Sequence, residues 1–436
     1  MIEELKKILN EKKHFLLGYS GGLDSTVLLH LLLKLKKKIN IYFRVIHINH
    51  QLNIDANSWS QHCKKECQKY NIPIIIKKVF IDVKKNNIEA ESRFIRYQTI
   101  YKYLQPKEII LTAHNLNDQC ETFLLALKRG SGPKGLSSMA IHKKNANIIH
   151  IRPLLNIDRT TIEKWAKKNK LKWIEDNSNS DTYYDRNFLR KKIIPILQER
   201  WPFFIENCVR SAKICSEQET ALNYFSKSIL KKKMLSDGSL KMKDLTGLKK
   251  EIINIILRNW IALQNFKIPT YKGLNEIYKN IIKSEKDASP KIGFKEYEIR
   301  KYKKKIYLIK PISPSIKNMI ISWHTPSIPL VLPNQLGVIT KNNIGIKIPS
   351  PGKKELINIR FQVNGYFYIQ GYPHKKKIKK IWQNLNIPIW NRNNIPLLFY
   401  NNRFISALGV FIIVEKNFIV KNYWHLSWHN NIIKNN

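Results

Sequence analysis

A short run of glycines and hydroxyl side chains has the composition of an anion-binding loop. The run follows an apolar segment, residues 14–19, that we predict to be a β-strand. Its residues are Ser20, Gly21, Gly22, Leu23, Asp24 and Ser25. Two glycines let the backbone bring N–H groups close to an anion, and a following helix adds positive partial charge at its N-terminus. The run lacks the lysine of a Walker A motif, which disfavours γ-phosphate transfer. An ordinary strand-to-helix turn is the alternative.

A second cluster of polar residues lies around residue 118. His114 ends a predicted strand, and Asp118 and Glu121 are three residues apart on a predicted helix. That spacing puts both carboxylates on one face near the helix N-terminus, where they can bind a cation or orient an amine. Complementing the helix dipole is the simpler alternative.

The elements around these two clusters are predicted to form a parallel sheet. Over residues 1–200, short apolar runs alternate with amphipathic segments, which is typical of an α/β, doubly wound sheet with helices on both faces. The predicted strands are residues 14–19, 41–48, 74–80 and 108–113, and the predicted helices are residues 25–35, 55–70, 88–103 and 117–128. Because such sheets bind ligands at the carboxyl ends of their strands, both clusters are expected at one edge.

Beyond residue 202 the alternation stops and two further regions follow. Helices are predicted over residues 206–233, 249–262 and 271–284. Residues 311–351 are spaced by prolines, and we interpret them as a connector poor in strands. After it come β-rich runs at 357–363 and 404–414 and a basic helix at 373–385. The predicted domains are 1–205, which is catalytic; 206–340, which is mainly helical; and 341–436, which is a small α+β domain.

The charge balance favours a polyanionic partner. The 436 residues include 77 Lys and Arg against 32 Asp and Glu, a formal net charge of +45. This excess points to nucleic acid or an anionic membrane surface, although part of it reflects a composition rich in Lys, Ile and Asn. No apolar stretch approaches the roughly 18 residues of a membrane-spanning helix, and no signal peptide is apparent. A cytoplasmic protein without membrane contact is therefore expected.

The five cysteines form no secreted disulfide framework, which favours a reducing compartment. His62, Cys63 and Cys67 lie close together on a predicted helix, but the sequence offers no second pair of ligands. We therefore predict no metal site built from these protein ligands.

The loop at residues 20–25 resembles that of the PP-loop ATP pyrophosphatases, which split ATP between the α and β phosphates. The resemblance implies that ATP is the nucleotide and that this loop holds the pyrophosphate. It also associates Asp24 with Mg²⁺ and the phosphates, since a carboxylate beside phosphates makes physical sense only with a cation between them.

The two clusters together resemble the tRNA(Ile)-lysidine synthetase family. Further stretches match the pattern of this family in order, at residues 152–155, 175–179, 185–190, 388–392 and 395–397. Asn117 departs from it, because the family usually has a second aspartate there. Asp118 is retained, so we expect activity to survive.

This resemblance implies a specific reaction. In an isoleucine tRNA with a CAU anticodon, the C2 oxygen of the wobble cytidine attacks the α-phosphate of ATP and pyrophosphate leaves. The ε-amine of L-lysine then displaces AMP at C2. The lysidine formed changes codon specificity from AUG to AUA. The candidate catalytic residues are Asp24, Asp118, Glu121 and Arg93. Asp118 and Glu121 would bind the lysine ammonium and help to take its proton.

Basic residues elsewhere are candidates for substrate contacts. The candidates in the first 200 residues are His114, Arg96, Arg186, Asn187 and Arg190, for which the partners would be AMP, the lysine carboxylate or tRNA. Lys376 and Lys379 are expected to bind tRNA phosphates. A basic helix face exposed to water is the alternative for the charged side chains. Trp382 and Trp390 are expected in a core rather than as base-stacking platforms.

Two other classes of protein remain open. A further PP-loop enzyme, either a tRNA 2-thiolase or a small-molecule synthetase, would share the loop. The chain lacks the C-x-x-C pair common in thiolating relatives, which favours an amine nucleophile, and a small-molecule enzyme has no need of a basic surface. A non-catalytic RNA-binding protein with a degenerate nucleotide fold would not need Asp24 and Asp118 intact. A homodimer is also left open.

Overall fold

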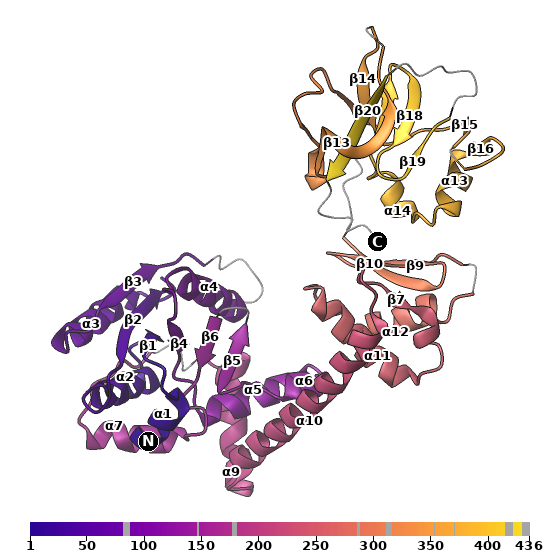
Figure 1. The fold of residues 1–436 in the computed structure, drawn as a ribbon. Helices are drawn as coiled ribbons and strands as arrows, with labels where there is room; N and C mark the ends of the chain where they lie inside the picture. Colours follow the sequence, from indigo (N-terminus) through magenta and orange to yellow (C-terminus); the bar gives the residue numbers. More distant parts are fainter. Residues whose placement is uncertain are drawn as a thin grey trace. The chain divides into compact units, whose positions relative to one another are not determined.

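The fold was analysed in a computed structural model of the chain. It describes residues 1–81, 88–145, 148–176, 181–285, 288–310, 316–352, 354–369, 371–414 and 422–429. The chain forms two compact units, Met1–Tyr224 and Phe225–Asn436 (Figure 1). Within the described ranges, no helix is both long and apolar enough to cross a bilayer.

The first unit is built on a six-stranded sheet with the order β3-β2-β1-β4-β6-β5. Its strands are β1 (His14–Gly18), β2 (Tyr42–Asn49), β3 (Ile74–Lys78), β4 (Ile109–Leu111), β5 (His142–Asn145) and β6 (Ile148–Ile151). All neighbours pair in parallel except β5 and β6. From β1 the chain winds first to β2 and β3 and then to β4 on the other side. The predicted doubly wound α/β fold is therefore confirmed.

Helices cover both faces of this sheet. The helices up to residue 233 are α1 (Ile2–Leu9), α2 (Leu23–Lys36), α3 (Ala56–Lys69), α4 (Ile88–Lys102), α5 (Leu116–Lys128), α6 (Pro133–Leu136), α7 (Arg159–Lys168), α8 (Asp185–Phe188), α9 (Ile194–Arg200) and α10 (Phe204–Lys233). Of these, α9 and the start of α10 pack with α5 in a separate apolar cluster and do not cover the sheet. Phe15 and Leu17 of β1 face a core shared with α1, α2, α3 and α7, whereas Leu16 points to the opposite face and packs with Ile100 of α4. This alternation is the strand period of two. The predicted bounds of the first four strands and their helices agree with the structure to within two residues.

The second unit begins with helices that pack on a four-stranded antiparallel sheet. The elements are β7 (Leu240–Lys241), α11 (Lys250–Leu263), α12 (Tyr271–Ile277), β8 (Lys291–Gly293), β9 (Glu298–Tyr302) and β10 (Lys305–Ile309). Trp260 is fully buried in their core, and its indole N–H donates to the Gly238 carbonyl at 2.8 Å. The sequence predicted only helices here. The strands were missed because they are short and carry charged residues such as Arg300 and Lys301 within the alternation.

Three antiparallel sheets and two short helices make up the rest of the second unit, as far as its residues are described. The strands are β11 (Ile320–Ser322), β12 (Leu330–Val331), β13 (Val338–Pro349), β14 (Ile357–Arg360), β15 (Tyr366–Phe367), β16 (Lys376–Lys377), β17 (Leu397–Tyr400), β18 (Arg403–Ala407), β19 (Phe411–Ile412) and β20 (Tyr423–His429), and the helices are α13 (Ile378–Asn384) and α14 (Ile389–Arg392). The five-stranded sheet has the order β11-β14-β17-β18-β19. Strand β13 lies between β12 and β20 in a three-stranded sheet, and β15 pairs with β16. Trp382 is buried, as predicted.

One sequence prediction for this region is wrong. The proline-spaced segment, residues 311–351, is not a connector poor in strands, because it contains the 12-residue strand β13. Within β13 proline occurs only at the end, as Pro349, opposite Tyr423 of β20. A proline there leaves the interior of the ladder intact. The prolines before and after this strand led to the wrong prediction, although residues 338–348 are rich in β-branched side chains and pair with both β12 and β20.

Candidate active site

The glycine loop connects β1 to α2, at the carboxyl edge of the parallel sheet. Gly21 has φ +84°, and a Cβ atom at this position would lie 2.6 Å from Ile174 Cδ1 and 2.9 Å from Cys63 Sγ. The Gly21 carbonyl accepts hydrogen bonds from Ile174 N at 2.9 Å and from Thr26 Oγ1 at 3.2 Å. Both the backbone conformation and the packing therefore require glycine at this turn.

The hydroxyl groups of Ser20 and Ser25, at the two ends of the loop, lie close together. Ser20 Oγ lies 3.0 Å from Ser25 Oγ and accepts from Gly22 N at 3.3 Å. Helix α2 follows Gly22, and no side chain in the described part of the protein caps it. Its first N–H groups can therefore donate to an anion held at the loop.

Alanine at the two glycines should separate folding from anion binding. Gly21→Ala should lower the free energy of unfolding by about 2 kcal/mol or more, because it adds left-handed strain and overpacking against Ile174. Gly22 has φ −75°, and its Cβ would make only ordinary contacts, the nearest 3.5 Å from Ser20 Oγ. Gly22→Ala should change the unfolding free energy by less than about 0.5 kcal/mol and weaken ATP binding. Denaturant unfolding and nucleotide titration measure the two effects. Equal destabilisation by both substitutions would contradict this account of the turn.

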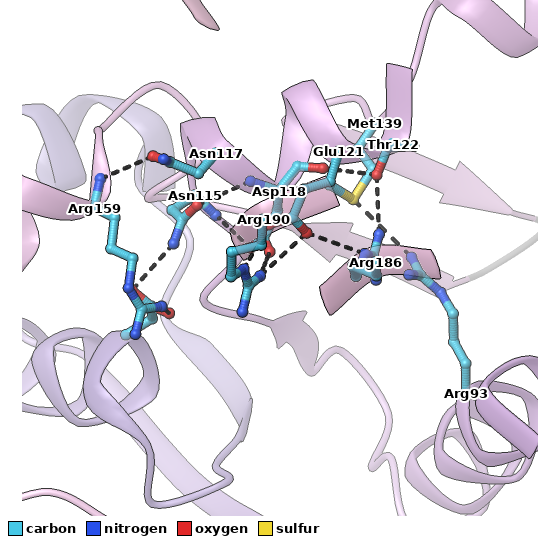
Figure 2. A network of polar contacts seen from close by, with 11 residues as sticks. Arg93, Asn115, Asn117, Asp118, Glu121, Thr122, Met139, Arg159, Arg186 and Arg190 are labelled. Carbon is cyan, nitrogen blue, oxygen red and sulfur yellow. Dashed lines mark hydrogen bonds and ion pairs between the residues drawn. The ribbon is translucent and has the colours of Figure 1, made fainter. Parts of the chain in front are cut away.

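Asp24, in the first turn of α2, accepts hydrogen bonds from Asn115 and Arg159, at the starts of α5 and α7; both donors are labelled in Figure 2. Its carboxylate accepts from Asn115 Nδ2 at 3.1 Å and from Arg159 Nη1 at 3.2 Å. Burial and the nearby Asp118 raise the pKa of Asp24, whereas Arg159 and Asn115 oppose that shift. The carboxylate is thus fixed beside the loop in a site of mixed charge.

Asn115 joins the loop to the start of α5. Its side chain accepts from Asp118 N at 3.0 Å, and Asp118 Oδ2 accepts from Asn115 N at 3.0 Å, which completes a capping box. Asn117 Oδ1 accepts from Arg159 N at 3.1 Å, at the start of α7. That hydrogen bond needs only an oxygen acceptor, which an asparagine supplies as well as the aspartate usual in the family pattern.

Asp118 and Glu121 lie together on α5 and share one guanidinium. Arg190 donates through Nε to Glu121 Oε1 at 2.6 Å and through Nη2 to Glu121 Oε2 and Asp118 Oδ1, both at 3.1 Å. The Glu121 side chain is 0% exposed and that of Asp118 is 15% exposed. Burial raises the pKa of Glu121, although the positive charge of Arg190 opposes this shift. Burial would lower the pKa of Arg190, but the charges of Glu121 and Asp118 outweigh it, so that the pKa of Arg190 is raised. Asp118 is therefore the more accessible carboxylate of the pair.

The other residues singled out from the sequence are distributed around this network. Arg186 lies with its Nε 3.2 Å from Glu121 Oε2 and donates to Thr122 Oγ1 at 3.1 Å. Arg93 Nη2 is 4.0 Å from Met139 Sδ, and Arg96 lies over the Tyr97 ring. His114 contacts Thr112 at the end of β4, and Asn187 donates to the Asp181 carbonyl at 2.9 Å. Of the matched stretch 175–179, residues 177–179 lie outside the described residues.

The two lysines predicted to bind tRNA belong to the second unit. Lys376, on β16, lies 3.9 Å from the centroid of the Tyr372 ring, and Lys379 is exposed on α13. Trp390, predicted to be in a core, is half-buried and contacts the Tyr302 and Tyr307 rings.

Sequence reasoning missed two residues that organise the site. Arg159 pairs with Asp24, and Gln119 clamps a loop by donating to the Met139 carbonyl at 2.7 Å and accepting from Met139 N at 2.8 Å. Arg159 could have been noticed, because Asp158 is a favourable N-cap residue and puts Arg159 in the first turn of α7. Cys63 and Cys67 are fully buried in the core of the first unit.

Comparison with known proteins shows which domains the chain contains. Residues 1–197 match a PP-loop domain, residues 240–307 a TilS substrate binding domain and residues 357–428 a TilS substrate C-terminal domain. The chain is 50% identical to the tRNA(Ile)-lysidine synthase of Buchnera aphidicola subsp. Schizaphis graminum, over 98% of this chain and 97% of that one. It is 41% identical to the enzyme of the same name from Photorhabdus laumondii, over 99% and 98%.

The chain belongs to the tRNA(Ile)-lysidine synthase family. The contacts drawn in Figure 2 all lie within residues 1–197, which match the PP-loop domain of this tRNA(Ile)-lysidine synthase family member. Among solved structures, the U34-tRNA thiolase NcsA from Methanococcus maripaludis matches 50% of this chain and 77% of its own, with 19% identity and a TM-score of 0.43.

Proposed function

We propose that this protein joins L-lysine to C2 of the wobble cytidine in tRNA(Ile) with a CAU anticodon, using ATP and passing through an adenylated tRNA. The observation that carries the proposal is the continuous contact between the phosphate loop and the carboxylates. It runs from Asp24 through Asn115 and Asp118 to Arg190 and Glu121. Adenylation and amine attack can therefore share one small site.

In the first half-reaction the loop residues hold the departing pyrophosphate. The N–H groups at the start of α2 and the hydroxyls of Ser20 and Ser25 supply donors. We propose that Asp24 also holds Mg²⁺, since this cation is commonly bound by one or two carboxylates together with substrate phosphates. Among the described residues each Asp24 oxygen accepts one hydrogen bond, which leaves a lone pair for a cation. The bound cation would neutralise charge that develops on the phosphates.

In the second half-reaction the carboxylates of α5 receive lysine. We propose that the ammonium binds Asp118, whose side chain is the more exposed, while the fully buried Glu121 holds Arg190 in place. Because the amine must lose a proton before it attacks, a carboxylate in contact with it can act as the base. Arg93 and Arg96 remain candidates for AMP or the lysine carboxylate.

Incorporation of labelled lysine into tRNA tests the proposed function. The protein, ATP and lysine are incubated with isoleucine tRNA that bears a CAU anticodon, and with methionine tRNA that bears the same triplet. Lysine should enter only the first tRNA, at the wobble cytidine, with release of AMP and pyrophosphate. Absence of incorporation into a competent isoleucine tRNA would refute the proposal.

Lysines of the second unit should contribute to tRNA binding by pairing with phosphates. Replacing both Lys376 and Lys379 by glutamine should weaken binding and reduce the slope of log K against log salt by about one for each phosphate that is no longer neutralised. Titrations at several salt concentrations measure this, with Lys6→Gln/Lys7→Gln on α1 as the charge-matched control. An unchanged slope would show that the two lysines are only solvated. Deleting residues 352–436 would be less informative, because it removes the partners of β11 and β13.

The location and assembly of the protein are proposals as well. We propose that it acts in the cytoplasm, where its tRNA substrate is found. A homodimer remains a proposal, and light scattering of the purified protein tests it.

A further inference from the structure

A chain of four polar side chains runs along the ends of β4 and β6. Arg152 Nη2 lies 3.2 Å from His150 Nδ1, His150 Nε2 lies 2.7 Å from Thr112 Oγ1, and Thr112 Oγ1 lies 2.9 Å from His114 Nδ1. Arg152 is itself anchored, since its Nη1 donates to the Ala140 carbonyl at 2.7 Å. His150 and Arg152 are each only 4% exposed.

The order of donors and acceptors in this chain is determined by its first member. A guanidinium can only donate, so His150 Nδ1 must accept and His150 must carry its proton on Nε2. That N–H donates to Thr112 Oγ1, which leaves the single hydroxyl proton of Thr112 to donate to His114 Nδ1. A neutral His114 then carries its proton on Nε2.

Both imidazoles are neutral in these surroundings. Burial, followed by the charge of Arg152, lowers the pKa of His150 to about 3. Burial and the positive charges of Arg96, Arg152 and Arg93 lower the pKa of His114 well below its usual range. Across the described residues, His114 Nε2 has no protein hydrogen-bond partner. The hydrogen-bonded series therefore ends at His114 Nε2, an N–H donor that is not used within the described protein and that lies near three guanidinium groups.

We infer that Arg152, His150 and Thr112 are positioning residues that lock His114 in its Nε2–H tautomer, so that His114 donates a hydrogen bond to an anionic oxygen and does not act as a base. The adjacent Asn115 contacts Asp24 of the phosphate loop. The oxygen that fits this position is therefore a non-bridging oxygen of the α-phosphate that is transferred. This assignment of the acceptor rests on the proposed function, whereas the tautomer does not.

The tautomer is tested first, in the full-length protein without substrates. Two-bond ¹H–¹⁵N correlation spectra of histidine-labelled protein, assigned with His114→Gln, should show Nδ1 of His114 unprotonated and Nε2 protonated. Thr112→Val removes the hydroxyl and should mix the two tautomers, whereas Thr112→Ser should preserve the wild-type pattern. A protonated Nδ1 in the wild type, or an unchanged pattern in Thr112→Val, would overturn the lock even if the protein makes lysidine.

The role of the donor is tested by the rate of lysine-independent tRNA adenylation. His114→Ala should lower this rate by about 10²-fold, as loss of a transition-state donor commonly does. His114→Gln supplies an amide N–H but cannot act as a base, and should retain the rate to within about tenfold. Thr112→Val should lower the rate and Thr112→Ser should not. Because the cations of Arg93, Arg96 and Arg152 and the imidazole of His150 face His114, the wild-type rate should show no titration of His114 between pH 6 and 8. Equal losses in His114→Gln and His114→Ala would identify a base instead.

Discussion

Asp24→Asn should lower the rate of tRNA adenylation by about 10³-fold while the protein remains folded. The substitution keeps the shape of the side chain and removes the charge that would hold a cation against the phosphates. One of the two donors, Asn115 Nδ2 or Arg159 Nη1, loses its acceptor, because the new amide nitrogen cannot accept. The missing hydrogen bond should cost about 1 kcal/mol of stability. ATP–pyrophosphate exchange in the presence of tRNA(Ile) measures the rate.

The control for this substitution is Asp55→Asn, at an exposed position just before α3 where the carboxylate caps no helix. It should leave both exchange and unfolding unchanged. Exchange at the wild-type rate in Asp24→Asn would refute the placement of the phosphates. Normal exchange with loss of lysine transfer would reassign Asp24 to the amine.

Arg190→Ala should both destabilise the fold and abolish lysine transfer. It leaves the carboxylate of Glu121 buried, and among the described residues the longer ion pair to Arg186 is the one that remains. Removal of one partner from a buried pair commonly costs 3–5 kcal/mol; because the Arg190 side chain is 30% exposed and Arg186 stays, we expect about 2 kcal/mol. Lysine transfer should also be abolished, since Asp118 and Glu121 are no longer held together. Denaturant unfolding and the lysine-incorporation assay measure the two effects.

Two further variants separate the ion pair from a general loss of packing. Arg129→Ala, an exposed guanidinium at the end of α5, should change the unfolding free energy by less than about 0.5 kcal/mol. Adding Glu121→Gln to Arg190→Ala removes the buried charge and should recover part of the stability. No recovery in the double variant would mean that the charge of Glu121 is not the cause.

The first unit could be predicted from the sequence because its signals are local. Each of the four predicted strands is followed by a helix signature, and the pair Asp118 and Glu121 depends only on helical spacing. Strands β5 and β6 were not predicted; they are short and pair with each other as an antiparallel hairpin. The partners of these carboxylates could not be predicted in the same way. Arg190 and Glu121 are 69 residues apart in the sequence, and Arg159 and Asp24 are 135 apart, so only the folded sheet brings them together. The sequence therefore indicated which groups carry charge but not how that charge is balanced.

Where the prediction failed, the local signal was ambiguous. Strand β9 interrupts its alternation with Arg300 and Lys301, and Lys301 is nonetheless buried because it donates to Ser284 and Glu285 at the end of a helical turn. Strand β13 is surrounded by prolines and becomes a strand through pairing with β12 and β20. In both cases long-range contacts decide the structure, and the neighbouring sequence does not report them.

The pairing of β13 with β20 also bears on how the chain is made. Strand β13 begins at residue 338, but its partner is not synthesised until residue 429 has been added. Every residue of the network in Figure 2 precedes residue 191. During translation these residues can therefore come together while the three-stranded sheet β12-β13-β20 still lacks β20. Until β20 emerges, β13 presents unpaired backbone groups to the chaperones and proteases around the ribosome. Premature termination between residues 349 and 423 would thus yield a chain with the complete network that we propose to be catalytic and with an open, aggregation-prone strand.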